Sequence, residues 1–145
     1  DVLGSRGLGD VYKRQYQDIL TYDVDIPEEI ANCKIPKITL QPLVENALYH
    51  GIKNKRGKGR IVVTGRREKD KCVIRVEDNG IGMTKERLNQ VRGGLTTKIE
   101  DSNDFYGLYN VNERIRLKFG EEYGLSIDSV LQEGTCVEVW LPWES

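Results

Sequence analysis

The stretch Val76–Met83, VEDNGIGM, comes after the alternating apolar run CVIRV and precedes TKERL, which is typical of a helix start. Asp-Gly and Asn-Gly turns are strong hairpin signals, so a hairpin turn is one interpretation of DNG. After Gly80, however, the chain continues with a second glycine and a helix start rather than with a second alternating strand. We therefore favour a strand that ends at Asp78, with Gly80 and Gly82 letting the backbone approach a ligand closely.

A carboxylate fixed at a strand end is a hydrogen-bond acceptor, which suits an exocyclic amine such as that of adenine. A calcium loop is disfavoured, because the sequence after Asp78 lacks alternating acidic ligands and the closing Glu. The chain contains no GxxxxGK[ST] sequence, so it is not a P-loop protein.

Length and composition favour one globular domain. The chain has 145 residues, of which 38% are hydrophobic and 31% charged, enough for one core. Its 22 Lys and Arg against 23 Asp and Glu leave no basic excess, so a nucleic-acid role has no support. Cys33, Cys72 and Cys136 lie far apart without a CxxC pair, which indicates reduced thiols. No apolar run approaches the roughly 18 residues of a membrane span.

The first residues differ in character from the rest. Residues 1–15, DVLGSRGLGDVYKRQ, lack periodicity and resemble a translated adapter sequence of the kind fused to proteins predicted from shotgun data. We expect a non-native leader there, with a native disordered arm as the alternative. The domain is expected to occupy residues 16–145.

Hydrophobic periodicity predicts alternating strands and helices in the rest of the chain. The expected elements are a strand over 20–26, a helix over 38–52, a hairpin over 59–78 with its turn at 68–71, a helix over 84–92, a loop over 93–106, a helix over 107–120, and strands over 124–130 and 135–142. Thr39, Gly51 and Thr84 are the expected helix caps. Hairpin-paired strands with interspersed helices predict an α+β fold, a two-layer sandwich with a mostly antiparallel sheet and helices on one face.

The first predicted helix carries a polar stripe around Asn46. At helical spacing the stripe includes Pro42, Tyr49, His50 and Lys53, opposite the leucines. Asn46 offers a neutral oxygen suited to Mg²⁺, and Lys53 or His50 would supply positive charge for a phosphate chain. The alternative is the solvated face of an amphipathic helix.

Taken together, the segments LQPLVENALYHGI, EDNGIGM, YGLYNVNERIRLKFG and EGTCVEVWLP resemble, in this order, the ATP-binding domain of sensor histidine kinases of two-component systems. The similarity points to the branch whose N box reads QPLVENA, and it runs from about Tyr16 to Trp143. It implies the Bergerat-type ATP-binding fold, with ATP and Mg²⁺ as ligands.

The resemblance also assigns roles to single residues. Asn46 would coordinate Mg²⁺ and thereby the phosphates, Asp78 would bind the adenine amine directly and through water, and Thr135 would reinforce that contact. The other residues implied at the nucleotide are Tyr49, His50, Lys53, Gly80, Gly82, Gly107 and Leu108. Gly107 and Leu108 would open a helix whose free N–H groups face phosphate. Residues 93–106 would form the ATP lid.

Two departures from the family pattern bear on activity. Phe105 replaces the first glycine of the usual Gly-x-Gly, which weakens the expected lid hinge. Pro42 lies where related ATPases such as type II topoisomerases and Hsp90 chaperones have a Glu that activates water, so autonomous hydrolysis should be weak. Glu45 is a candidate aid to metal or proton handling, or else a surface carboxylate.

The resemblance implies transfer of the γ-phosphate to a histidine on an upstream helical dimerisation domain that this chain lacks, and indirectly a response regulator as partner. His50 is expected in the pocket and not as the phosphoacceptor. We expect a cytoplasmic location, as the cytoplasmic part of a membrane-bound kinase. Two alternatives stay open: a stand-alone ATPase of this fold, and a degenerate or switch-type nucleotide-binding module without phosphotransfer.

Overall fold

The computed structural model describes residues 20–31, 40–48, 59–95 and 106–143. The elements in chain order are β1 (Leu20–Asp25), α2 (Glu28–Ala31), α3 (Leu40–Asn46), β2 (Gly59–Glu68), β3 (Lys71–Asp78), α4 (Lys85–Gly94), α5 (Tyr106–Phe119), β4 (Gly124–Val130) and β5 (Gly134–Pro142). The expected strands and helices occur in the expected order within these ranges, and the short helix α2 is an addition to them.

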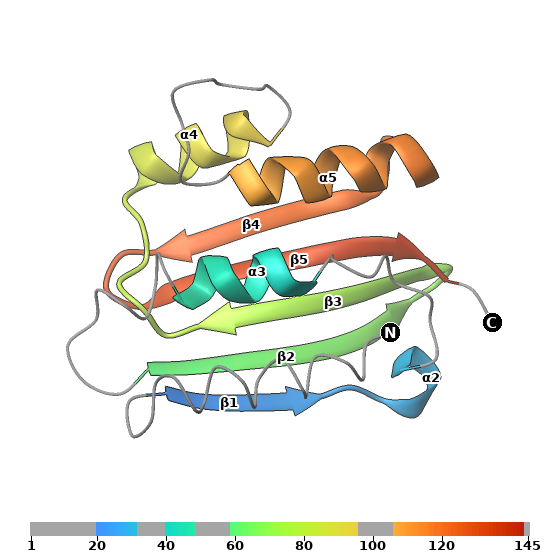
Figure 1. Cartoon of the computed structure of the whole chain (residues 1–145), viewed down its shortest axis with the longest axis horizontal. Helices are drawn as coiled ribbons and strands as arrows, with labels where there is room; N and C mark the ends of the chain where they lie inside the picture. The colour runs from blue at the N-terminus through green and yellow to red at the C-terminus, as the bar shows by residue number, and fades with distance from the viewer. Residues whose placement is uncertain (1–19, 32–39, 49–58, 96–105, 144–145) are drawn as a thin grey trace.

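The five strands form one sheet in the order β1-β2-β3-β5-β4. β1 runs parallel to β2, and every other neighbouring pair is antiparallel. Figure 1 shows α3 over β3 and β5, roughly along their direction, while α4 and α5 run along β4, which they contact. The predicted two-layer α+β sandwich, a mostly antiparallel sheet with helices on one face, is confirmed.

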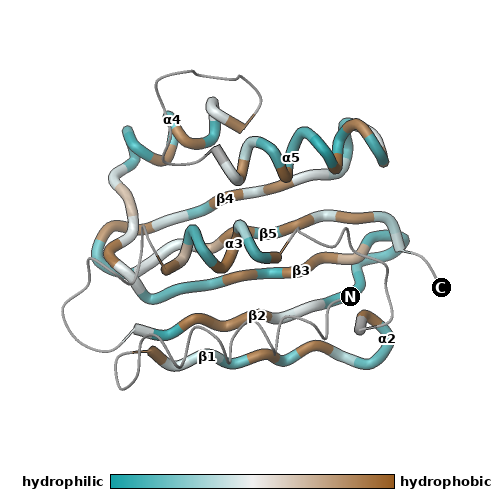
Figure 2. The backbone as a smooth tube through the Cα atoms, in the orientation of Figure 1, coloured by the Kyte–Doolittle hydropathy of each residue, from teal (hydrophilic) through white to brown (hydrophobic). Residues whose placement is uncertain are grey.

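Strand alternation builds the core between sheet and helices. Along β5 every second residue from Thr135 to Leu141 is buried, and the residues between them are partly exposed. These side chains meet the apolar residues of α3 and α5, which are buried at Leu43, Val44 and Leu108 among others. The tube coloured by hydropathy shows the same alternation in the strands (Figure 2).

The opposite face of the sheet is polar and is stabilised by contacts between side chains. Arg66 donates to Glu138 at 2.9 Å and to Glu68 at 2.8 Å. The guanidinium of Arg66 also lies 5.6 Å from the ring centroid of Trp140. Among the described strand residues, this face therefore offers no broad apolar surface for a further layer.

Three local details differ from the sequence-based expectations. The short helix α2 was not expected; it begins directly after Pro27, whose carbonyl accepts from the Ile30 N–H at 3.0 Å. The turn between β2 and β3 is shorter than the expected 68–71, because β2 continues to Glu68 and β3 begins at Lys71. Gly93 and Gly94 extend α4 instead of opening the predicted loop.

Other expectations at element ends are confirmed or lie outside the described residues. Thr84 caps α4, because its side chain accepts from the Arg87 N–H at 3.2 Å. Thr39, Gly51 and residues 96–105 lie outside the described residues, as does the predicted leader, residues 1–15.

The described cysteines, Cys72 and Cys136, are not joined in a disulfide. Cys72 is buried and Cys136 is partly exposed, and burial raises the pKa of the Cys136 thiol to about 11, so it is protonated at neutral pH. Among the described residues no cluster of three metal-ligating side chains occurs. The helices within the described ranges are also too short or too polar to cross a bilayer.

Asn112 ties the edge strand β4 to the helical layer. Its side chain is 4% exposed, donates to the Leu95 carbonyl at 2.8 Å and accepts from the Leu125 N–H at 2.9 Å. Gly124 has φ +131°, and a Cβ there would lie 2.4 Å from the Asn112 oxygen. One buried amide thus joins the end of α4, the middle of α5 and the start of β4.

Replacing Asn112 by Ala should destabilise the fold by about 2 kcal/mol, because it removes the partner of the buried Leu95 carbonyl and of the partly buried Leu125 N–H. Asn110→Ala is the matched control, since Asn110 is exposed on the same helix. Urea unfolding followed by circular dichroism measures both. Equal effects of the two substitutions would contradict the assigned role.

Candidate functional site

A lateral row of paired residues crosses the sheet at the end of β3. The strand registers pair Tyr22 with Ile61, Ile61 with Asp78, Asp78 with Thr135, and Thr135 with Ser129. Directly paired residues project to the same face of a sheet, so all five side chains point toward the helical layer. The row is apolar on β1 and β2 apart from the tyrosine hydroxyl, and polar on β3, β5 and β4.

Asp78 is held in a fixed direction within this row. Its side chain is 6% exposed, and Oδ1 accepts from the Gly80 N–H at 2.8 Å. Asn79 anchors the loop to β2: its N–H donates to the Arg60 carbonyl at 3.2 Å, and its Oδ1 accepts from the Arg60 N–H at 2.6 Å. A carboxylate has about four acceptor positions, so Asp78 can also accept from a ligand.

The other side of the loop is held by β4 and its turn. The Met83 N–H donates to Ser129 Oγ at 2.9 Å, and the Gln132 N–H donates to the Ile81 carbonyl at 2.7 Å. The segment from Asp78 to Met83 is therefore fixed to strands on both sides, which limits the movement of the carboxylate.

Gly82 is required by the loop itself. It has φ +66°, and a Cβ there would lie 2.0 Å from the Val130 carbonyl oxygen. The sequence analysis explained Gly82 by close approach of the backbone to a ligand. In the structure the close contact is with the β4–β5 turn. Gly134 faces the same constraint, since it has φ +135° and its Cβ would lie 2.0 Å from the Asp78 carbonyl oxygen.

Asn46 ends α3 with a buried acceptor that has no partner among the described residues. Leu40, Leu43 and Val44 are buried and fix the helix on the sheet. Asn46 Oδ1 is buried, and nothing in the described part of the chain donates to it. A buried orphan acceptor costs free energy unless a ligand satisfies it, and a neutral amide oxygen is a suitable ligand for Mg²⁺. The predicted metal ligand therefore fits the ion.

Glu45, the other candidate on α3, is only half-buried and accepts from Gln41 Nε2 at 3.0 Å. The predicted pocket residues Tyr49, His50 and Lys53 lie outside the described residues.

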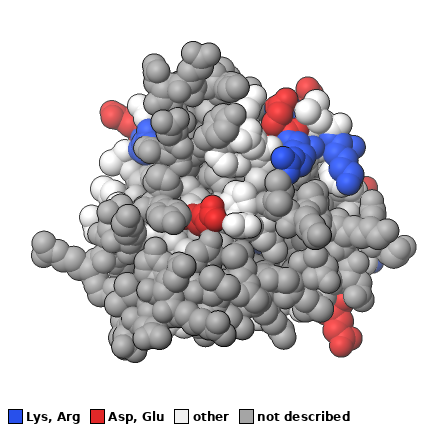
Figure 3. Space-filling view, in the orientation of Figure 1, with Lys and Arg blue, Asp and Glu red and all other residues white. Residues whose placement is uncertain are grey.

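The first turn of α5 lies beside α3. A Cβ on Gly107 would be 3.5 Å from Pro42 Cβ, and Leu108 is buried. The first N–H groups of a helix have no partner within it, so this end of α5 carries donors and positive potential next to α3. Figure 3 shows the basic side chains of α5 gathered over its other half, where Arg116 and Lys118 occupy the last turn.

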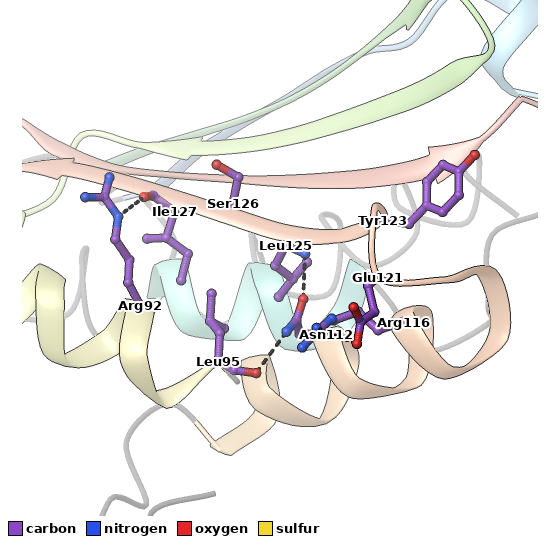
Figure 4. Close-up of a pocket in the computed structure, with 9 residues that line it drawn as sticks. All are labelled: Arg92, Leu95, Asn112, Arg116, Glu121, Tyr123, Leu125, Ser126 and Ile127. Carbon is purple, nitrogen blue, oxygen red and sulfur yellow. Dashed lines mark hydrogen bonds and ion pairs between the residues drawn. The ribbon is translucent and has the colours of Figure 1, made fainter. Parts of the chain in front are cut away.

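Two cavities bounded by described residues lie near this region, and the larger is lined by none of the predicted site residues. It measures about 540 Å³ and is bounded by the ends of α4, α5 and β4. Its two arginines are paired, Arg92 with the Ile127 carbonyl at 2.9 Å and Arg116 with Glu121 at 3.6 Å (Figure 4). A smaller cavity of about 200 Å³ touches Asp78, Ser129 and Thr135, but its lining also includes Arg75, Glu77 and Cys136, whose side chains project to the opposite face of the sheet. We therefore place the candidate site at the helix-facing side of the polar row, where the oriented carboxylate lies, and not at either cavity.

A buried carboxylate at a strand end, a glycine loop after it and an amide at the end of the facing helix are the features that the sequence predicted for an ATP-binding α+β domain. Residues 36–145 match the family of histidine kinase-, DNA gyrase B-, and HSP90-like ATPases. The chain belongs to this family.

Within it, several of the similar curated proteins are sensor histidine kinases. The chain is 35% identical over 133 residues to the sensor histidine kinase YesM of Bacillus subtilis, covering 91% of this chain and 21% of YesM. It is 30% identical over 133 residues to the sensor histidine kinase BtsS of Escherichia coli, covering 92% of this chain and 21% of BtsS. The chain is therefore a homologue of sensor histidine kinases and spans about a fifth of the length of these relatives.

Solved structures show the same fold. The catalytic domain of histidine kinase ThkA superposes with a TM-score of 0.70 at 13% identity, covering 98% of this chain and 90% of that one. The histidine kinase domain of the blue-light activated kinase of Erythrobacter litoralis gives 0.66 at 14% identity, covering 96% and 62%. The predicted kinase-type catalytic domain fold is confirmed.

Sequence reasoning missed Ser129 and Asn79, which hold the loop from its two sides. A signal for Ser129 exists in the sequence, because it continues the inward period of Leu125 and Ile127 with a polar residue. For Asn79 the sequence offers only a common turn residue.

Gly82→Ala should destabilise the protein by at least about 2 kcal/mol, since it adds left-handed strain and a backbone clash. Gly93→Ala is the matched control: it lies in α4 with nothing within 4 Å of its Cβ position, and should be neutral or slightly stabilising. Chemical denaturation of both variants tests the difference. A neutral Gly82→Ala would show that the loop relaxes freely.

Proposed function

We propose that this chain binds ATP with Mg²⁺ and presents the γ-phosphate for transfer to a histidine on an upstream dimerisation domain, as part of two-component signal transduction. The observation that carries the proposal is the buried, oriented carboxylate of Asp78 at the end of a polar cross-sheet row. The orphan oxygen of Asn46 supports it independently.

Asp78 accepts from the exocyclic amine of adenine, directly and through water. The bond from Gly80 fixes the carboxylate, so the adenine amine meets an acceptor that needs no rearrangement. Thr135, paired with Asp78 across the strands, reinforces the contact from β5. Gly80 and Gly82 shape the floor of this pocket.

Asn46 would hold Mg²⁺ through Oδ1, and the ion would supply positive charge to the phosphates. Mg²⁺ usually keeps waters and is shared between one or two protein oxygens and substrate phosphates, so a single amide suffices. The free N–H groups at Gly107 and Leu108 face the phosphate chain from the start of α5. By the family resemblance, Tyr49, His50 and Lys53 border the nucleotide.

Phosphoryl transfer requires positioning and charge neutralisation, and Mg²⁺ supplies part of the neutralisation when bound. The nucleophile then comes from another domain. Pro42 cannot act as a general base, which favours transfer over hydrolysis by the chain alone. Glu45 assists metal or proton handling at the same helix end.

The partners of the proposed function are the phosphoacceptor helices of the same kinase and, through them, a response regulator. Since the chain spans about a fifth of YesM and BtsS, these partners belong to the whole protein. A cytoplasmic location of this part is expected from the use of ATP.

Asp78→Asn should weaken ATP binding at least about tenfold, because the Asn amide can present a donor to the adenine amine and lacks the charge that strengthens the bond. Glu77→Gln is the matched control, since Glu77 is exposed and projects to the opposite face of the sheet. Isothermal titration of ATP into the three proteins measures the effect. Absence of binding by the unchanged chain at millimolar ATP would sink the kinase proposal and favour a degenerate module.

Asn46→Ala should abolish the gain in ATP affinity that Mg²⁺ gives, while affinity for metal-free ATP stays unchanged. The same substitution should leave stability unchanged or slightly raised, because it removes a buried acceptor that no described residue satisfies. Titrations with Mg²⁺ and with chelator, together with thermal unfolding, separate the two effects. If Mg²⁺ still raises the ATP affinity of the Asn46→Ala variant, other residues hold the metal.

A further inference from the structure

Ser129 connects three parts of the candidate site through one hydroxyl. Its oxygen accepts from the Met83 N–H at 2.9 Å, and its proton goes to the Gly134 carbonyl, also at 2.9 Å. Thr135 Oγ1 lies 2.9 Å from the same oxygen. Ser129 therefore contacts both the loop after Asp78 and the residue paired with Asp78.

The donor in the Ser129–Thr135 contact is identified by counting protons. A serine hydroxyl has one proton and two acceptor positions. We assign the Ser129 proton to the Gly134 carbonyl, which can only accept, and this assignment makes Thr135 the donor between the two hydroxyls. The two acceptor positions of Ser129 are then filled by the Met83 N–H and the Thr135 O–H.

This arrangement leaves Thr135 without a proton for the pocket. Its oxygen can accept from a ligand but cannot donate to one, and the carboxylate of Asp78 beside it is also an acceptor. The polar part of the row thus presents only acceptors to a ligand. A 6-amino purine offers donors at this position, whereas a 6-oxo purine offers a carbonyl oxygen that would face acceptors.

We propose that Ser129 is a positioning residue that makes this site select 6-amino over 6-oxo purines. It does so by accepting the hydrogen bond of the Thr135 hydroxyl, so that this proton is not available to the ligand. The proposal rests on the proposed nucleotide-binding function and assigns part of its base specificity to a residue that does not touch the base. Removal of the Ser129 hydroxyl frees the Thr135 proton, which can then donate to the 6-oxo oxygen.

The test is the ratio of the dissociation constants of inosine diphosphate and adenosine diphosphate, measured by titration calorimetry. The unchanged chain should favour ADP at least about tenfold, and Ser129→Ala should reduce this preference about fivefold or more. Ser129→Thr retains the hydroxyl on a strand and should keep the preference. Ser126→Ala, on the other face of β4, is the control that should change nothing.

A second substitution separates specificity from structure. Thr135→Val removes the hydroxyl with little change of shape, so no proton can reach the 6-oxo oxygen and the preference for ADP should stay high. In the Thr135→Val background, Ser129→Ala should no longer lower the preference. A general loosening of the site by Ser129→Ala would lower it in both backgrounds and would overturn the proposal.

The outcomes also distinguish this inference from the function on which it depends. If the unchanged chain binds neither nucleotide at millimolar concentration, the proposed function fails. If it binds ADP selectively and Ser129→Ala leaves the ratio unchanged, the role of Ser129 is wrong while the nucleotide site stands. Amide exchange at Met83, which should accelerate in Ser129→Ala, shows whether the variant has lost the hydrogen bond.

Discussion

A buried carboxylate needs donors around it, and this requirement at Asp78 shapes the region at the end of β3. Leaving such a group without partners costs several kcal/mol, so its surroundings must be polar and fixed. The Gly80 N–H supplies one donor, and the loop that carries it is bonded to β2 through Asn79 and to β4 through Ser129. The apolar core and the polar site therefore share one row of the sheet.

Close backbone packing is the second consequence of this arrangement. The loop after Asp78 and the β4–β5 turn approach each other so closely that Gly82 and Gly134 have no room for a Cβ. The glycines of the motif thus serve the loop geometry first, and any contact with a nucleotide uses a backbone already fixed by the turn. A rigid acceptor of this kind reduces the reorganisation that ligand binding would need.

The sequence predicted the elements well where regular spacing places one face of a strand or helix in the core and the other face in solvent. Alternation along β3 and β5, helical spacing at Leu108, Val111 and Ile115, and the cap at Thr84 predicted the elements with small errors at their ends. It failed at α2, a helix too short for periodicity, and at Gly93 and Gly94, whose low helix propensity is overridden by the packed helix before them. Ser129 and Asn112 were missed because their hydrogen bonds depend on strand pairing and helix packing, which local periodicity does not specify.

By itself the sequence determined the α+β class, the family and the identity of the candidate side chains, because these depend on local periodicity and on motifs that each occupy a few residues. The tertiary structure decided which of those residues meet. Only the register of β3, β5 and β4 brings Asp78, Thr135 and Ser129 into one row, and only the packing of α3 buries the Asn46 oxygen away from any donor in the described part of the chain. The physical reason is that strand pairing and burial join residues distant in sequence, and each hydrogen-bond direction depends on all the neighbours together.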